Sequence, residues 1–123
     1  MLHDYYYTII SQQTTENATL FDVMLLPECN VYKGHFPGMP VAPGVCNIQM
    51  IKECVERIAE KPLLLESMMQ CKFLSMIIPE QHRKLQIQIE STENEHSRIN
   101  VSATIGCDTT VFVVFKGEFT KQL

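Results

Sequence analysis

The run Gly34-His35-Phe36-Pro37-Gly38-Met39-Pro40-Val41-Ala42-Pro43-Gly44-Val45 leads directly into the one long helical pattern of the chain. Its three prolines fix φ and bias the residues before them away from helical backbone angles. The loop is therefore expected to hold a single shape, with His35 facing the N-terminus of a helix. Because histidine titrates near neutral pH, a histidine held in this way is a candidate general base.

The segment after this loop has the spacing of a single helix. Glu56 and Lys52 occupy its polar positions, and Pro62 is a stop signal. The apolar positions that recur at helical spacing are Val45, Ile48, Ile51, Val55 and Ile58. The pattern predicts a helix from about Gly44 to Glu60.

The other segments have the β-branched content and the alternation of strands. Strands are expected at Tyr5–Ser11, Ala18–Leu26, Leu63–Ile78, Leu85–Ile89, Ile99–Ile105 and Val111–Phe119, with polar turns at Ser91–Ser97 and Gly106–Thr109. Two strands, one helix and four strands predict the α+β class, with an antiparallel sheet packed on the helix. One helix covers only part of a sheet face, so we expect the sheet to curl around it or a second chain to pair with it.

Composition limits the class of protein. The chain has 123 residues, 46% of them hydrophobic, and no linker or low-complexity tract, so residues 1–123 are expected to form one domain. A formal net charge of −4 gives no reason to expect nucleic-acid binding. The apolar runs are too short to span a membrane, and the N-terminus does not resemble a secretory signal. A cytoplasmic location is expected.

The five cysteines have no C-x-x-C spacing, which argues against a disulfide framework and against a zinc site. We expect no metal ion. Cys46, close to the helix start, is either a nucleophile with a lowered pKa or a small packing residue, and packing is favoured. His3, His82 and His96 lie near the terminus or in polar segments and are expected to be exposed.

The segment Gly34–Val45, the helix after it, and Lys72-Phe73 followed by Pro79 resemble the hotdog-fold 3-hydroxyacyl-[acyl-carrier-protein] dehydratases. The resemblance implies a sheet wrapped around one long central helix, in a dimer joined edge to edge. It implies an active site between the protomers, with a loop histidine from one and a helix carboxylate from the other. It also implies a substrate carried on the phosphopantetheine of acyl carrier protein or on coenzyme A, with no other cofactor.

The resemblance assigns roles to several residues. His35 matches the family histidine that removes a proton from C2, and Phe36 beside it is expected at the substrate. Gly44 and Val45 match the residues whose backbone N–H groups bind the thioester carbonyl. A helix N-terminus suits that role, because its N–H groups and dipole stabilise negative charge that develops on the carbonyl oxygen.

The helix departs from the family pattern at the acid. The family has an acid followed four residues later by glutamine, whereas this chain has Gln49 and then Glu53. A glutamine amide positions a hydroxyl or water but cannot deliver a proton as a carboxylic acid does. Glu53 lies about 6 Å further along the helix axis, so it would need a shift or a water relay to act. The alternative for Glu53 is a solvated carboxylate, and for Gln49 a buried polar residue without catalytic role.

Three functions follow for this chain. The first is a 3-hydroxyacyl thioester dehydratase, slow or relay-assisted because of Gln49. The second is a degenerate subunit that binds acyl thioesters or completes a heterodimer, in which a paralogue supplies the acid opposite His35. The third is a hotdog thioesterase in which Glu53 activates water. Acyl carrier protein is the expected partner, together with a second copy or a paralogous hotdog chain.

Overall fold

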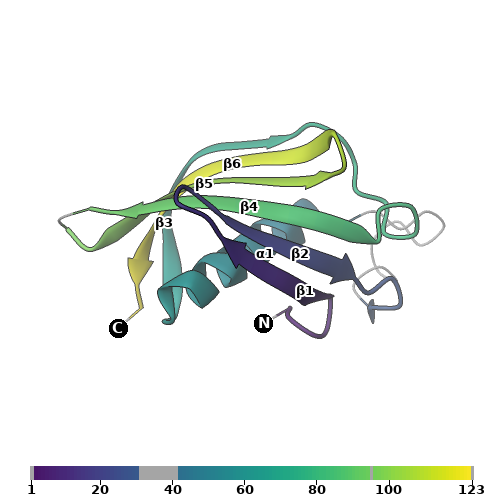
Figure 1. Ribbon diagram of the computed structural model, residues 1–123, viewed down its shortest axis with the longest axis horizontal. Coiled ribbons are helices and arrows are strands. Elements are labelled where there is room, and N and C mark those ends of the chain that lie inside the picture. The colour runs from purple at the N-terminus through teal and green to yellow at the C-terminus, as the bar shows by residue number, and fades with distance from the viewer. Residues whose placement is uncertain (1, 31–41, 95, 123) are drawn as a thin grey trace.

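The computed structural model describes residues 2–30, 42–94 and 96–122 (Figure 1). In chain order the elements are β1 (Tyr7–Thr14), β2 (Thr19–Leu25), α1 (Gly44–Ala59), β3 (Leu63–Phe73), β4 (Lys84–Glu93), β5 (Arg98–Cys107) and β6 (Thr110–Lys121). The predicted order of two strands, one helix and four strands is therefore confirmed.

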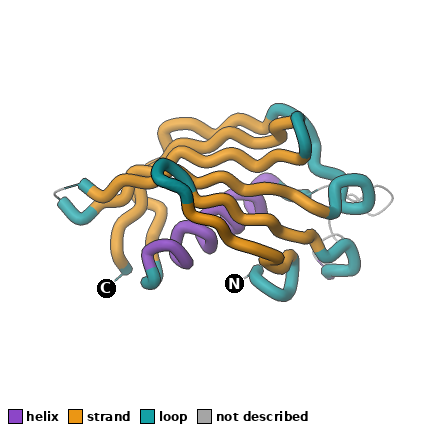
Figure 2. The backbone as a smooth tube through the Cα atoms, viewed as in Figure 1, coloured by secondary structure: helices purple, strands orange, loops and turns teal. Residues whose placement is uncertain are grey.

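The six strands form one antiparallel sheet with the order β1-β2-β4-β5-β6-β3. The sheet curves around α1, which lies along its concave face (Figures 1 and 2). β1 and β3 are the two edge strands. The helix is therefore flanked by β1 on one side and by β3 on the other.

Alternation along the strands builds the core. In β2 the inward positions include Phe21 and Val23, and in β4 they include Leu85, Ile87 and Ile89, all of them buried. Side chains of a strand alternate between the two faces of a sheet, so every second residue meets the helix. Burial of these apolar side chains is the main force that holds α1 against the sheet.

Several predicted strand boundaries are wrong. β1 continues to Thr14 rather than Ser11, and β4 continues to Glu93 rather than Ile89, so the turn predicted at Ser91–Ser97 begins only after Glu93. The first strand begins at Tyr7 rather than Tyr5, because the N–H groups of Tyr5 and Tyr6 donate to the carbonyl of Leu2 and close a turn. The third strand ends at Phe73 rather than Ile78. Beyond Phe73 the chain leaves the sheet, and the Ile77 carbonyl accepts a hydrogen bond from the N–H of Ala42, just before the helix.

The predicted apolar stripe of the helix is also partly wrong. Val45 is 74% exposed, whereas Cys46, Met50 and Cys54 are buried together with Ile51 and Val55. Residues four apart share a helix face, so Cys46, Met50 and Cys54 form one buried row. Cysteine and methionine pack as apolar residues, and the β-branched spacing alone did not reveal this row.

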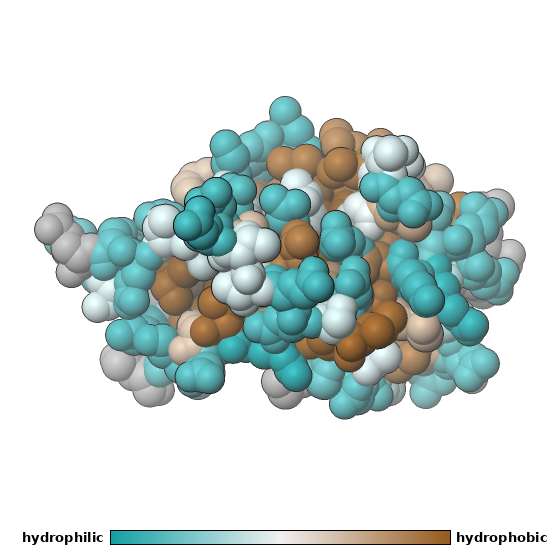
Figure 3. Space-filling model, viewed as in Figure 1, coloured by the Kyte–Doolittle hydropathy of each residue, from teal (hydrophilic) through white to brown (hydrophobic). Residues whose placement is uncertain are grey.

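The edge strand β3 carries an unusual amount of exposed apolar surface. Its exposed apolar side chains, with those just after the strand, are Leu64, Leu65, Met68, Met69, Phe73, Leu74 and Met76. Hydrophobic atoms are visible at the upper edge of the molecule, where β3 runs (Figure 3). Exposed apolar patches of this kind mark interaction sites.

No helix of the described residues is long and apolar enough to cross a membrane.

Candidate active site along the helix

The helix begins with backbone donors that are not used within the helix. Pro43 is the N-cap residue, and its carbonyl accepts hydrogen bonds from the N–H groups of Cys46 and Asn47 at 3.0 and 3.2 Å. Within the described residues the N–H groups of Gly44 and Val45 have no hydrogen-bond partner. The first turn of a helix presents such donors together with the positive end of its dipole, so this end of α1 can bind an oxygen that carries negative charge.

The ring of Phe73 lies directly against the start of the helix. A Cβ atom added to Gly44 would lie 2.9 Å from Cζ of Phe73, closer than a carbon atom can approach without displacing the ring. Glycine at this position therefore lets the aromatic ring lie against the helix start, and a larger residue would displace the ring. Phe73 itself is 51% exposed, so it forms an apolar wall beside the helix N-terminus.

Gln49 and Glu53 contact each other one helical turn apart. Nε2 of Gln49 donates to Oε2 of Glu53 at 2.8 Å. The rise of about 6 Å between the two positions is thus bridged by their side chains. Gln49 is half-buried, on the side of α1 that also carries the exposed Val45.

Glu53 is not a solvated carboxylate, because only 5% of its surface is exposed. Its Oε1 accepts hydrogen bonds from the N–H of His3 at 3.0 Å and from the hydroxyl of Tyr7 at 3.1 Å. Its Oε2 accepts from the N–H of Leu2 at 2.8 Å as well as from Gln49. We call these residues, Leu2, His3, Tyr7, Gln49 and Glu53, the Glu53 network. All four donors come from the protein, so both carboxylate oxygens are occupied.

The Glu53 network was not predicted from the sequence. Leu2 and His3 stand 51 and 50 positions before Glu53, and Tyr7 stands 46 before it. No spacing rule connects such residues. The sequence offered only a weak signal, namely a carboxylate, Glu53, on the predicted helix and several tyrosines in the N-terminal segment.

Burial shifts the pKa values of the groups around this network. Burial is the main cause that raises the pKa of the Tyr7 phenol, and the nearby Cys54 and Glu53 raise it further. Burial likewise raises the pKa of the Cys54 thiol to about 12. The pKa of Cys46 is also raised, chiefly by burial, so the alternative of a thiol activated by a lowered pKa is wrong.

These shifts predict a loss of stability in alkaline solution. The unfolded chain ionises Cys54 near its ordinary pKa of 9.0, whereas the folded chain keeps the thiol neutral up to about pH 12. The stabilisation is complete below pH 9 and is lost as the pH rises toward 12. Urea unfolding should therefore give a free energy about 1 kcal/mol lower at pH 10 than at pH 8 from this thiol alone. A Cys54→Ala variant should lose that part of the pH dependence. If its free energy of unfolding changes with pH as in the wild type, the loss of stability does not come from Cys54.

The Tyr7 hydroxyl is expected to stabilise the fold through Glu53. Tyr7→Phe should lower the free energy of unfolding by about 1.5–3 kcal/mol, because it removes a buried hydrogen bond to a charged group. Thr8→Val is the matched control, since the Thr8 hydroxyl donates to Asp4 at the surface and its loss should cost less than about 0.5 kcal/mol. If urea unfolding shows that both variants lose the same free energy of unfolding, the hydrogen bond between Tyr7 and Glu53 does not stabilise the fold as expected.

A cavity of about 330 Å³ lies beside the network, between β1 and the C-terminal half of α1. The residues that line it include His3, Tyr7, Ile9 and Arg57.

The expected exposure of two histidines is wrong. His3 is half-buried and packs edge-on against the Tyr7 ring, and His82 is half-buried against Phe112. His96 is exposed as expected.

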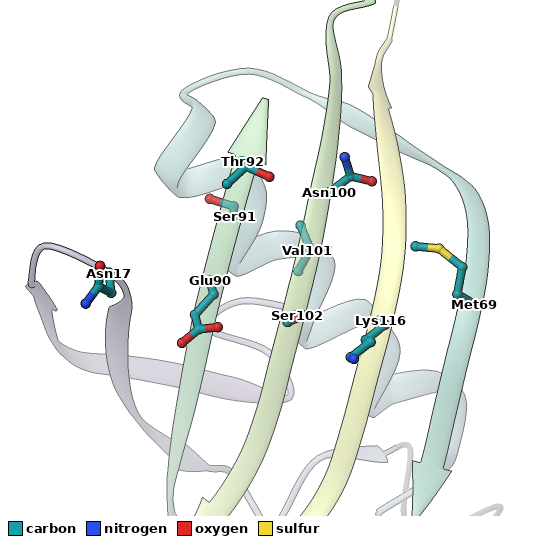
Figure 4. Close-up of a pocket in the computed structure, with 9 residues that line it drawn as sticks. All are labelled: Asn17, Met69, Glu90, Ser91, Thr92, Asn100, Val101, Ser102 and Lys116. Atoms are coloured by element: carbon teal, nitrogen blue, oxygen red, sulfur yellow. The ribbon is translucent and has the colours of Figure 1, made fainter. Parts of the chain in front are cut away.

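A second cavity, of about 520 Å³, lies on the outer face of the sheet (Figure 4). Glu90 of β4 and Lys116 of β6 lie on either side of Ser102 of β5, with α1 behind the strands. None of the predicted site residues lines this cavity.

Among the described residues there is no group of three His, Cys, Asp or Glu side chains that could hold a metal ion.

The predicted site residues therefore fall into two groups. Gly44, Val45, Gln49 and Glu53 lie along the first three turns of α1, and the last two are in direct contact. His35 and Phe36 lie outside the described residues.

Solved structures with this architecture identify the fold. The chain superposes on the dehydratase heterocomplex ApeI:P from Xenorhabdus doucetiae with a TM-score of 0.72 and 19% identity, over 92% of this chain and 96% of that one. It superposes on a putative thioesterase from Shewanella oneidensis with a TM-score of 0.59 and 8% identity, over 97% and 85% of the two chains. The sheet curved around one helix is thus a hotdog fold.

Sequence comparison then gives the family. A family model described as ApeI-like, ApeI dehydratase, matches residues 11–117, and the chain belongs to this family of hotdog dehydratases. It is 28% identical over 99 residues to the 3-hydroxyacyl-[acyl-carrier-protein] dehydratase FabZ of Lactiplantibacillus plantarum. That match covers 75% of this chain but 63% of the relative, less than two thirds of its length. The resemblance to hotdog dehydratases is confirmed.

Proposed function

We propose that this chain is a dehydratase subunit that acts on 3-hydroxyacyl chains carried by acyl carrier protein and forms the trans-2-enoyl thioester. The family match and the FabZ relative, whose name specifies an acyl-carrier-protein substrate, support the reaction class. The N–H groups of Gly44 and Val45, which have no hydrogen-bond partner among the described residues, support thioester binding. No cofactor other than the phosphopantetheine that carries the substrate takes part.

The reaction is an elimination in which the chain supplies the base and the enolate site. His35 takes the proton from C2, and the N–H groups of Gly44 and Val45 stabilise the negative charge that develops on the thioester oxygen. The C3–O bond breaks, and the hydroxyl takes up a proton and leaves as water. Phe73, whose ring lies beside the helix N-terminus, contacts the acyl chain, and Phe36 is a second substrate-binding residue.

The single observation that supports our proposal for the source of the last proton is the environment of Glu53. Its two oxygens already accept four hydrogen bonds, and 5% of its surface is exposed. Gln49, the half-buried neighbour, carries no acidic proton. We therefore propose that the helix of this chain supplies no general acid, and that Glu53 has a positioning role.

The missing acid comes from a second hotdog chain. We propose a heterodimer in which a paralogue places a helix carboxylate opposite His35, which makes one full site, while the site that contains Gln49 binds acyl chains without efficient turnover. The exposed apolar side chains of the edge strand β3 support pairing along that edge. The related Xenorhabdus structure is itself described as a heterocomplex.

The reaction class is tested with the purified chain and 2-enoyl thioesters on acyl carrier protein. Hydration, the reverse reaction, removes the conjugated enoyl absorbance without release of free thiol. We expect slow loss of absorbance and no thiol. Release of thiol at a comparable or higher rate would overturn the proposal and indicate a thioesterase.

A further inference from the structure

We propose that Glu53 is a positioning residue that fixes the side-chain amide of Gln49, so that the amide oxygen is presented to the acyl chain and a hydroxyl at C3 is bound in preference to a keto group. This inference rests on the proposed function, because it places the acyl chain beside Gln49.

The contact between the two side chains determines which end of the amide faces Glu53. A carboxylate only accepts hydrogen bonds, and only the NH₂ end of a glutamine amide donates them. Nε2 of Gln49 must therefore face Oε2 of Glu53, as the 2.8 Å contact has it. The oxygen Oε1 of Gln49, for which no hydrogen bond to the described residues is found, is the end of the amide that faces away from Glu53.

The carboxylate that holds the amide is itself immobilised. The N–H groups of Leu2 and His3 can only donate, and both point at Glu53. The Tyr7 hydroxyl, which is fully buried, adds a third contact. If the Gln49 amide turned over, its oxygen would face Oε2 of Glu53 at about the same distance, which is repulsive between two acceptors. Gln49 therefore cannot reverse to suit a ligand.

A fixed acceptor discriminates between oxygen substituents. A hydroxyl at C3 donates to Oε1 of Gln49, whereas a keto oxygen only accepts and leaves Oε1 unpaired. One hydrogen bond between neutral groups corresponds to about a three- to tenfold difference in affinity. A freely rotating amide would show no such preference, since it could offer either end.

The test compares the affinities of amide-linked pantetheine analogues of 3-hydroxybutyrate and 3-ketobutyrate by isothermal titration. The wild-type chain should bind the hydroxy analogue about three- to tenfold more tightly. Glu53→Gln gives position 53 an NH₂ group, so that the Gln49 amide can reverse and the preference should disappear or invert. Thr8→Val is the matched control, because the Thr8 hydroxyl donates to Asp4 at the surface and lies outside the Glu53 network, so this variant should keep the preference.

Gln49→Met keeps the length of the side chain without an amide and should abolish the preference, which covers the case in which Glu53→Gln does not fold. Binding of both analogues without preference in the wild type would overturn this inference and leave the proposed function in place. The inference would also be overturned, and the proposed function left in place, if Glu53→Gln folds and retains the preference for the hydroxy analogue. Failure of both analogues to bind the wild type would overturn the proposed function together with the inference.

Discussion

Gln49→Glu should raise the rate at which the purified chain hydrates 2-enoyl thioesters by about 10²–10⁴-fold, the usual contribution of a general acid. The new carboxyl group would lie at the position from which Gln49 now contacts Glu53 at 2.8 Å. Two carboxylates that close cannot both ionise easily, so the pKa of the new carboxyl is raised and the pair retains one proton near neutral pH. A retained proton next to the substrate is what the wild-type helix lacks.

The control for this gain is Gln49→Met, which alters the same position without adding a proton donor. It should give no increase in hydration. The gain in Gln49→Glu should also decline as the pH rises, because the shared proton is then lost. A folded Gln49→Glu variant with wild-type activity would contradict the view that the missing acid is the main defect of this site.

His35→Ala, introduced into the Gln49→Glu variant, should lower the hydration rate by about 10²–10⁴-fold. The imidazole is the only group in the proposed mechanism that exchanges a proton with C2, so its removal leaves no base. Binding of acyl pantetheine should persist, because the donors of Gly44 and Val45 lie at the helix start and do not depend on the imidazole. Steady-state kinetics and equilibrium binding separate the two effects.

His96→Ala provides the comparison for His35→Ala. His96 is an exposed histidine after β4, far in sequence from the proposed site, and its replacement should leave turnover unchanged. Turnover that survives His35→Ala would rule out His35 as the base. Loss of turnover in both variants would indicate a general effect on the fold.

Local sequence patterns predicted most of the fold. The alternation Leu85, Ile87, Ile89 marks the inner face of β4, and the proline-rich loop before Gly44 marks the start of α1. The patterns failed where tertiary contacts override them. Leu63–Ile78 is largely apolar, yet the strand stops at Phe73, where the chain turns toward the residues before the helix.

The candidate site was predictable only in part. Gln49 and Glu53 were expected on one helix face because residues four apart are neighbours, and their contact agrees with this. The burial of Glu53 was not predictable, because it depends on donors from Leu2 and His3 about fifty positions earlier in the chain. Helical spacing identifies neighbours within a helix and says nothing about a segment that covers it.

The most direct test of the account is a mixing experiment between the wild-type chain and the double variant His35→Ala/Gln49→Glu. The wild type has the histidine without the helix acid, and the double variant has the acid without the histidine. If the site is shared between two hotdog chains, mixed pairs contain one site with both groups, and their hydration rate should exceed that of either parent by at least tenfold. Two affinity tags verify that mixed pairs have formed. A mixed sample whose rate equals the average of the two parents would contradict a site built from His35 of this chain and an acid from its partner.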